Sequence, residues 1–185
     1  RHDSLIDTVY RQRYSFISAQ VVSNSVNQID NFITINKGSD FGVKPGMGVI
    51  NNAGVVGIVR QTSRNYATVA SLLGSQTKIS AAIKRNGYFG SLVWDNTSTE
   101  YVYLTDIPKH ADILKGDSVI TSGYSTTFPR GIYIGRVENV GFDPGSSFYD
   151  LKVKLTTDFN NLTYVYVILD KTKPQLDSLN NAILR

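Results

Sequence analysis

The stretch KPGMGVINNAGVVGIV, residues 44–59, decides the fold, because its main features return later in the chain. It places a glycine turn before a strand ending in Val-Ile, then a loop, then a strand built on Gly-x-Val. KGDSVITSG at residues 115–123 and GIYIGRV at residues 131–137 repeat this order, 70 positions later (116 − 46 = 70). One β-hairpin pattern therefore occurs twice, which indicates a duplicated domain.

The duplication extends well beyond this hairpin. The offset between the copies rises from 70 to 78 (135 − 57) and then to 83 (149 − 66), and the increase falls in turns, where insertions are tolerated. Each copy supplies about six short strands, enough to close a small barrel. The corresponding segments are SAQVV from Ser18 and GSLVW from Gly90, FITIN from Phe32 and YVYLT from Tyr101, GMGVI from Gly46 and GDSVI from Gly116, GIVRQT from Gly57 and GRVENV from Gly135, and the strand-turn-strand units that begin at Tyr66 and Tyr149.

Composition supports an all-β class. The 185 residues are 41% hydrophobic, enough for one sizeable core or two small ones, and 15 glycines with 11 tyrosines suit strands joined by tight turns. The 19 basic and 15 acidic side chains are spread along the chain, which argues against a nucleic-acid surface. The absence of cysteine excludes disulfides and cysteine-ligated metals. No apolar run approaches the ~20 residues that a membrane span needs.

The first 17 residues differ from the rest, because they lack glycine and proline and space their apolar side chains as a helix does. Such a short helix is marginal alone. We interpret it as the end of a coiled coil that pairs with a second copy, or as a helix packed on the domain behind it. The self-association residues would be Leu5, Ile6, Val9 and Phe16. The expected organisation is a helix at 1–17, a first barrel at 18–86, a second barrel at 87–170 and a tail at 171–185.

Six glycines are expected to serve backbone geometry and not ligand binding. Glycine adopts positive φ without a Cβ penalty, which tight turns between short strands require. The six are Gly46, Gly57, Gly116, Gly123, Gly131 and Gly135.

A doubled barrel raises the hypothesis of a chymotrypsin-like protease, and Gly116-Asp117-Ser118 resembles the start of a nucleophile loop. A serine nucleophile needs a histidine base, an orienting acid and an oxyanion hole. His2 lies in the helix, and His110 lies in the same predicted barrel as Ser118. In the other copy Gly48 stands where Ser118 stands, so this position is a turn-to-strand junction, and no catalytic site is predicted.

The sequence supports a metal site or a cofactor site no better than it supports a protease site. His110 and Asp112 are too few for a metal site, which needs three or four converging ligands. Acidic residues that could form a carboxylate pair lie beside turns or strand ends, where such residues are common: Asp106, Asp112, Asp117 and Glu138. No cofactor is predicted.

Two stretches resemble the MreC family of rod shape-determining proteins of bacterial cell-wall elongation. They are TINKGSDFGVKPGMGVINNAGVVGIV from Thr34 and DILKGDSVITSGYSTTFPRGIYIGRV from Asp112, and the resemblance covers about residues 18–170. It implies two β-barrel domains in the periplasm, preceded by a coiled coil and one transmembrane helix outside this fragment. It also implies a fold similar to chymotrypsin-like proteases without protease activity.

The resemblance further implies a non-enzymatic scaffold that assembles with itself and engages penicillin-binding protein 2 together with MreD, MreB and RodA. The localisation implied is the periplasmic domain of a single-pass inner-membrane protein. The alternative is a β-barrel adaptor domain of an envelope transport assembly, which would also place small barrels after a coiled coil.

A partner-binding face is predicted on the strands EYVYLT and TYVYVIL. Period-two alternation directs Val102, Leu104, Val165 and Val167 into the barrel cores. The tyrosines between them then point outward, where their apolar area and polar tip suit an interface. The four tyrosines are Tyr101, Tyr103, Tyr164 and Tyr166. The repeat places both strands in one barrel, so the four rings would form one aromatic patch. The alternative is that the rings cover the second barrel against the first barrel or against the tail.

Overall fold

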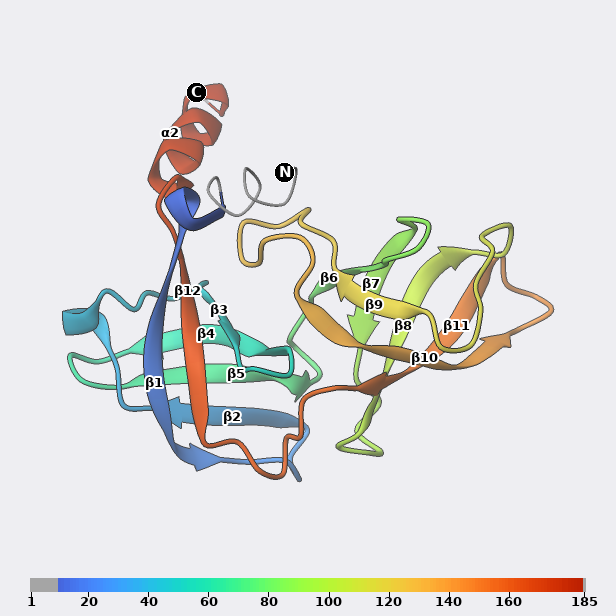
Figure 1. The fold of residues 1–185 in the computed structure, drawn as a ribbon, viewed down its shortest axis with the longest axis horizontal. Helices are drawn as coiled ribbons and strands as arrows, with labels where there is room; N and C mark the ends of the chain where they lie inside the picture. The colour runs from blue at the N-terminus through green and yellow to red at the C-terminus, as the bar shows by residue number, and fades with distance from the viewer. Residues whose placement is uncertain (1–9, 185) are drawn as a thin grey trace.

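The chain folds into two closed six-stranded antiparallel β-barrels, which lie beside each other in a computed structural model that describes residues 10–184 (Figure 1). The all-β class and the pair of six-stranded barrels are therefore confirmed. The strands are β1 (Tyr14–Asn24), β2 (Asp30–Ile35), β3 (Gly48–Ile50), β4 (Val55–Thr62), β5 (Ala67–Gly74), β6 (Ser80–Ile83), β7 (Phe89–Val93), β8 (Tyr101–Pro108), β9 (Ser118–Thr121), β10 (Tyr133–Phe142), β11 (Phe148–Leu155) and β12 (Tyr164–Asp170). A 3-10 turn, η1 (Ser39–Phe41), precedes β3, and α2 (Lys173–Ile183) follows β12.

The two halves of the chain exchange their sixth strands. The first barrel closes in the order β1-β12-β3-β4-β5-β2, so its sixth member comes from the end of the chain. The second closes in the order β10-β11-β8-β7-β6-β9, with β6 from the first repeat. The predicted domain boundaries are therefore wrong for two strands. β6 lies within residues 18–86 but belongs to the second barrel, and β12 lies within residues 87–170 but belongs to the first barrel. The cause is pairing of β12 with β1 and β3, and of β6 with β7 and β9.

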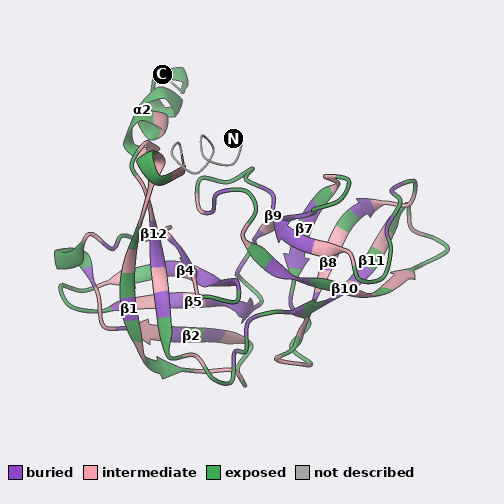
Figure 2. Cartoon of the chain, viewed as in Figure 1, coloured by how far each residue is buried: buried purple, intermediate pink, exposed green. Residues whose placement is uncertain are grey.

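Alternating burial fills the inside of each barrel with apolar side chains, and these join in one connected hydrophobic cluster across both barrels (Figure 2). The residues expected inside on β8 and β12 are fully buried, which confirms the alternation: Val102, Leu104, Val165 and Val167. The largest fully buried side chains come from both barrels and include Ile33 and Leu72 of the first, and Ile83 and Leu151 of the second. Because Val165 and Val167 arrive from the second half of the chain, the first core is incomplete without β12.

The helix expected at 1–17 ends earlier than predicted. Residues 10–13 are helical, but β1 begins at Tyr14 and pairs with β12 from Tyr14 to Gln20. Phe16 is thus a strand residue opposite Ile168, because the ladder to β12 outweighs its local helical spacing. Leu5, Ile6 and Val9 lie outside the described residues. Within residues 10–184, no helix is both long and apolar enough to cross a membrane.

The predicted structural glycines fall into two groups. Gly46, Gly116, Gly123 and Gly131 have φ between 79° and 99°, the left-handed region that favours glycine. A positive φ does not explain Gly57 and Gly135, which occupy corresponding positions on β4 and β10. A Cβ at Gly57 would collide with the carbonyl oxygen of Ala70 on β5, and one at Gly135 with that of Lys154 on β11. Close strand approach therefore accounts for this second pair.

A partly buried ion pair joins the residue before β1 to the last residue of β12. Asp170, whose side chain is 4% exposed, accepts hydrogen bonds from Arg13 Nη2 at 2.9 Å and from Thr172 Oγ1 at 2.7 Å. Burial opposes ionisation of this carboxyl, but the hydrogen bonds from Arg13 and Thr172 outweigh it and hold the pKa of Asp170 below its usual value. The pair stands where the helical residues 10–13 enter β1 and where β12 leads into α2.

The strand exchange predicts which fragment can fold alone. Residues 76–162 contain β6–β11 and should form a closed barrel, whereas residues 87–170, the division expected from the repeat, lack β6 and should not. A missing strand leaves β7 and β9 with unpaired edges and the core open to water. Amide chemical-shift dispersion and cooperative thermal unfolding would be measured for both fragments. A folded 87–170 fragment beside an unfolded 76–162 fragment would contradict the exchange.

The Arg13–Asp170 pair predicts a pH dependence of stability. Because the folded-state pKa of Asp170 is lowered, its stabilisation is present above the ordinary carboxyl value of about 4 and is lost as the pH falls through the folded-state value. Asp170→Asn should therefore lower the free energy of unfolding in urea more at pH 7 than at pH 3. An equal loss at both pH values would show that ionisation of Asp170 contributes nothing.

Candidate interaction surface

Asp112, Asp117 and His110, which were considered for catalysis or metal binding, are engaged in structural contacts, and His2 lies outside the described residues. Arg85 donates to Asp117 through Nε and Nη2, both at 2.9 Å, and to Asp112 Oδ2 through Nη1 at 3.0 Å. These hydrogen bonds from Arg85 lower the pKa of Asp117, despite its partial burial. The His110 ring instead packs edge-on against Tyr88, with ring centroids 5.7 Å apart.

Ser118 and Gly48 occupy the turn-to-strand junctions expected of them. Each is the first residue of its strand, Ser118 of β9 and Gly48 of β3. Glu138 pairs with Lys115 at 3.7 Å. Among residues 10–184 no group of three or more histidine, aspartate or glutamate side chains is placed to hold a metal ion.

The four predicted interface tyrosines do not form one patch. Tyr101 and Tyr103 lie on β8 of the second barrel, and Tyr164 and Tyr166 lie on β12 of the first. The expectation of a single patch is wrong because β12 crosses to the other barrel. Tyr101 stacks under Lys152 Nζ, 4.4 Å from its ring centroid, and Tyr164 is exposed. A partner-binding role for these side chains stays a prediction.

The loop between β9 and β10 reaches from the second barrel onto the first (Figure 1). Its Phe128 is 5% exposed and covers Gly48, the first residue of β3. A Cβ at Gly48 would lie 2.5 Å from Cε1 of this ring, so only glycine leaves room for it. Glycine is required here by close approach, and the contact holds the two barrels together.

Polar contacts reinforce the junction between the barrels. Thr157, which follows β11, donates from Oγ1 to the carbonyl oxygen of Val55 at 3.0 Å. Asn24 at the end of β1 donates to the carbonyl oxygen of Phe159 at 2.7 Å. Thr157 and Phe159 both belong to residues 156–163, the segment that connects β11 to β12. The crossing segment is therefore fastened along its length.

An apolar row continues from the Phe128 contact across the outer face of the first barrel. Register pairs Gly48 with Ile58, Ile58 with Ala70, and Ala70 with Phe32, so four adjacent strands contribute to one row. Phe128 covers the Gly48 end, whereas the ring of Phe32 at the other end is 43% exposed. Ile58, Ala70 and Phe32 form the floor of a cavity of about 600 Å³. We call this cavity the β4–β5–β2 groove.

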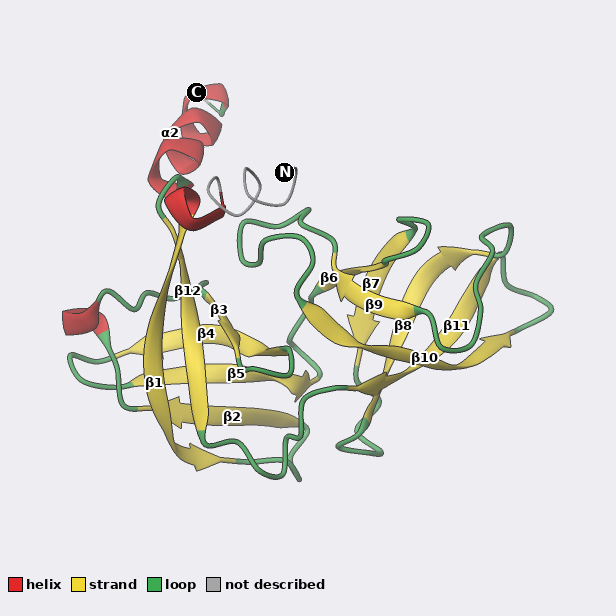
Figure 3. Cartoon of the chain, viewed as in Figure 1, coloured by secondary structure: helices red, strands yellow, loops and turns green. Residues whose placement is uncertain are grey.

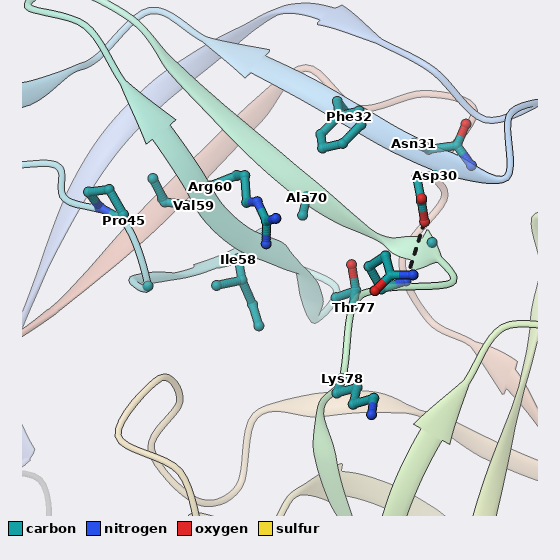
Figure 4. Close-up of a pocket in the computed structure, with 13 residues that line it drawn as sticks. Asp30, Asn31, Phe32, Pro45, Ile58, Val59, Arg60, Ala70, Thr77 and Lys78 are labelled. Atoms are coloured by element: carbon teal, nitrogen blue, oxygen red, sulfur yellow. Dashed lines mark hydrogen bonds between the residues drawn. The ribbon is translucent and has the colours of Figure 1, made fainter.

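The rim of the groove is mainly basic (Figure 4). Arg60 and Lys78 line it, are exposed, and make no ion pair with any described residue. The rim also holds one acidic residue, Asp30, whose Oδ1 accepts from Ser75 N at 2.9 Å and Ser75 Oγ at 2.8 Å, so two cations outnumber one carboxylate. An apolar floor with two free cations suits a partner segment that presents apolar side chains flanked by carboxylates.

Sequence reasoning missed both parts of this surface. Phe128 lies in the family stretch that starts at Asp112, where nothing local predicts its burial, and Phe32 begins the repeated segment FITIN, where nothing local predicts a groove. The available signal was an aromatic residue on the polar face of FITIN. Its neighbours Ala70 and Ile58 become apparent only once the strand register is known.

The fold defines a tandem β-barrel protein, and comparison with known proteins gives its family. The family model for the rod shape-determining protein MreC, barrel core, matches residues 21–169. The cell shape-determining protein MreC of Listeria monocytogenes is 34% identical over 152 residues, which cover 75% of this chain and 52% of that protein. The chain belongs to the MreC family. It spans about half the length of curated relatives, 44% in the case of Escherichia coli.

Solved structures agree with this assignment. MreC of Listeria monocytogenes superimposes with a TM-score of 0.81 at 28% identity, covering 91% of this chain and 86% of that one. A complex between penicillin-binding protein 2 and MreC from Helicobacter pylori contains the same fold, with a TM-score of 0.67 at 18% identity over 86% of this chain and 99% of that chain.

The Phe128 contact predicts a loss of stability on truncation. Phe128→Ala should lower the free energy of unfolding by about 3 kcal/mol, because a buried phenylalanine is replaced by a cavity. Tyr124→Ala in the same loop is the control, and its exposed side chain should cost little. Urea unfolding of both variants gives the comparison. Equal, small losses would show that Phe128 does not join the barrels.

Proposed function

We propose that this chain is a non-enzymatic scaffold of cell-wall elongation, which maintains rod shape by organising peptidoglycan synthases. Membership of the MreC family supports this role, because its curated relatives are cell shape-determining proteins. The structural observation that carries the proposal is the joined pair of barrels, which exchange strands and meet at the Gly48–Phe128 contact. The same membership favours the scaffold over an adaptor of envelope transport.

The proposed partner of the β4–β5–β2 groove is penicillin-binding protein 2. Three features support the groove as its docking place: an apolar floor, a basic rim, and continuity with the buried Phe128 contact. Such an apolar patch with a polar rim is typical of protein interfaces. The complex from Helicobacter pylori supports the choice of partner.

The remaining partners and the location follow from the family resemblance. MreD, MreB and RodA are proposed to contact parts of the protein beyond these barrels. We propose that the barrels lie in the periplasm and that a coiled coil and one transmembrane helix, outside this fragment, anchor them and bring two copies together. A related structure describes the major periplasmic domain of a filament-forming MreC, which supports both the location and self-assembly.

Two groove variants test the docking proposal. Phe32→Asp and Ile58→Asp place a carboxylate on the apolar floor, where it opposes burial by a partner. Both should weaken binding to the penicillin-binding protein 2 of the same organism at least about tenfold, or ~1.4 kcal/mol. Val22→Asp is the matched control, since Val22 is an exposed apolar residue of β1 in the same barrel. Binding would be measured by biolayer interferometry, with thermal unfolding confirming the fold.

The tyrosines are tested in parallel. Tyr101→Ser and Tyr166→Ser, on different barrels, should leave the affinity unchanged if the groove carries the contact. If these variants lose binding to penicillin-binding protein 2 while the groove variants bind fully, the tyrosines and not the groove form the binding site. Undiminished affinity in all four variants would contradict both surfaces.

A further inference from the structure

A second cavity adjoins the β4–β5–β2 groove across a tight turn. It has a volume of about 570 Å³, and two of its lining residues, Pro45 and Gly46, also line the groove. Figure 4 shows Pro45 at the end of the groove that lies away from Asp30. The turn of residues 44–47 therefore separates two neighbouring hollows.

Three segments from distant parts of the chain form this second cavity (Figure 3). They are the 44–47 turn before β3, Thr126 and Thr127 of the β9–β10 loop, and residues between 168 and 177 at the end of β12 and the start of α2. Apolar side chains line it as well, among them Met47. Because the β9–β10 loop comes from the second barrel, the cavity depends on contact between the two barrels.

Three lysines line this cavity, which we call the lysine cavity. Lys44 and Lys171 are exposed, and Lys173 is half-buried. The Nζ atom of Lys173 lies 3.5 Å from the position that a Cβ on Gly46 would take, so this cation stands at the border between the two hollows. None of the three lysines forms an ion pair within the described part of the chain.

The carboxylates of the lysine cavity do not neutralise it. Asp170, whose side chain is 4% exposed, accepts hydrogen bonds from Arg13, which does not line the cavity, and from Thr172. Asp177 is exposed on α2. Three cations therefore face one unbalanced carboxylate, an excess of two positive charges (3 − 1 = 2). Such a surface attracts a ligand that carries negative charge.

The turn between the two hollows is fixed to β4. Gly46 donates its backbone N–H to the carbonyl oxygen of Val59 at 2.8 Å, and Val59 donates its own to the carbonyl oxygen of Met47, also at 2.8 Å. The φ of 88° at Gly46 makes the turn tight. A ligand that occupies both hollows thus meets a preformed surface, which lowers the ordering cost of binding.

We propose that the groove and the lysine cavity together bind one acidic segment of a partner protein. Its apolar side chains lie on Ile58 and Phe32, and its carboxylates cross the Gly46 turn to the three lysines. A small anion would use the lysines alone and leave the apolar floor uncovered. This two-part site, which rests on the proposed docking role of the groove, specifies the chemistry of the segment that docks.

Charge reversal in the lysine cavity tests the proposal. The cavity variant combines Lys44→Glu with Lys171→Glu, and the control combines Lys84→Glu with Lys154→Glu, two exposed lysines that line neither hollow. A phage-displayed library of random peptides is selected on the full 185-residue chain. The most enriched peptide is then titrated by fluorescence anisotropy against the chain, both variants and Phe32→Asp. Thermal unfolding confirms that each variant is folded.

The enriched peptides should combine apolar residues with two or more aspartates or glutamates. The cavity variant and Phe32→Asp should each weaken binding of the peptide at least about tenfold, because each removes one part of the contact. The control should weaken it less than about threefold, since salt screens distant exposed charges. Inorganic phosphate should displace the peptide no better than sodium chloride of equal ionic strength.

Four results would overturn the proposal: no enriched peptide, enriched peptides without acidic residues, equal effects of the cavity and control variants, or an unchanged affinity in Phe32→Asp. Specific displacement by phosphate would also overturn it, because it would identify a small-anion site.

Failure of this site can be told apart from failure of the docking proposal, because penicillin-binding protein 2 takes no part in the measurement. If the peptides bind as expected but penicillin-binding protein 2 does not bind the chain, the two-part site stands and the choice of partner is wrong. If penicillin-binding protein 2 needs the groove while the cavity and control variants act alike on the peptide, the docking role stands and the acidic segment is wrong.

Discussion

Pairing of β12 with β1 is the interaction on which the rest of the structure depends. The seven paired residues from Tyr14 to Gln20 close the first barrel with a strand that arrives from the second half of the chain. The reciprocal placement of β6 closes the second barrel with a strand from the first half. Two covalent crossings therefore join the barrels, and neither barrel can complete its core without the other half of the chain.

The exchange explains where the proposed interaction surface lies. The crossings bring the β9–β10 loop against β3, and Phe128 then covers Gly48 at one end of the apolar row. The rest of that row stays open as the β4–β5–β2 groove, flanked by Arg60 and Lys78. A partner that binds the groove meets a surface whose position relative to the second barrel is already set, which lowers the ordering cost of binding. This suits a scaffold that displays fixed surfaces.

The sequence predicts the strands well but not their exchange. Each repeated segment corresponds to a strand, from SAQVV in β1 to TYVYVIL in β12, because period-two burial is a local property. Strands β6 and β12 occupy equivalent places in the two barrels, so their burial patterns are the same whichever barrel they join. The error over Phe16 has a related cause, since the ladder to β12 is a long-range contact invisible to local helical spacing.

The surface was harder to predict because it depends on register. Phe32, Ala70 and Ile58 lie far apart in the sequence and become neighbours only through the pairs β2–β5 and β4–β5. The burial of Phe128 likewise could not be predicted, because it depends on contact between the two barrels.

Strand exchange and the Phe128 contact are expected to make the two barrels one rigid body. Residual dipolar couplings of the backbone amides, measured for each barrel in the intact chain, test this most directly. One alignment tensor, equal in magnitude and orientation for both barrels, is the predicted result. Two different tensors would show that the barrels move independently, and that the joined surface proposed for the scaffold does not exist as a fixed arrangement.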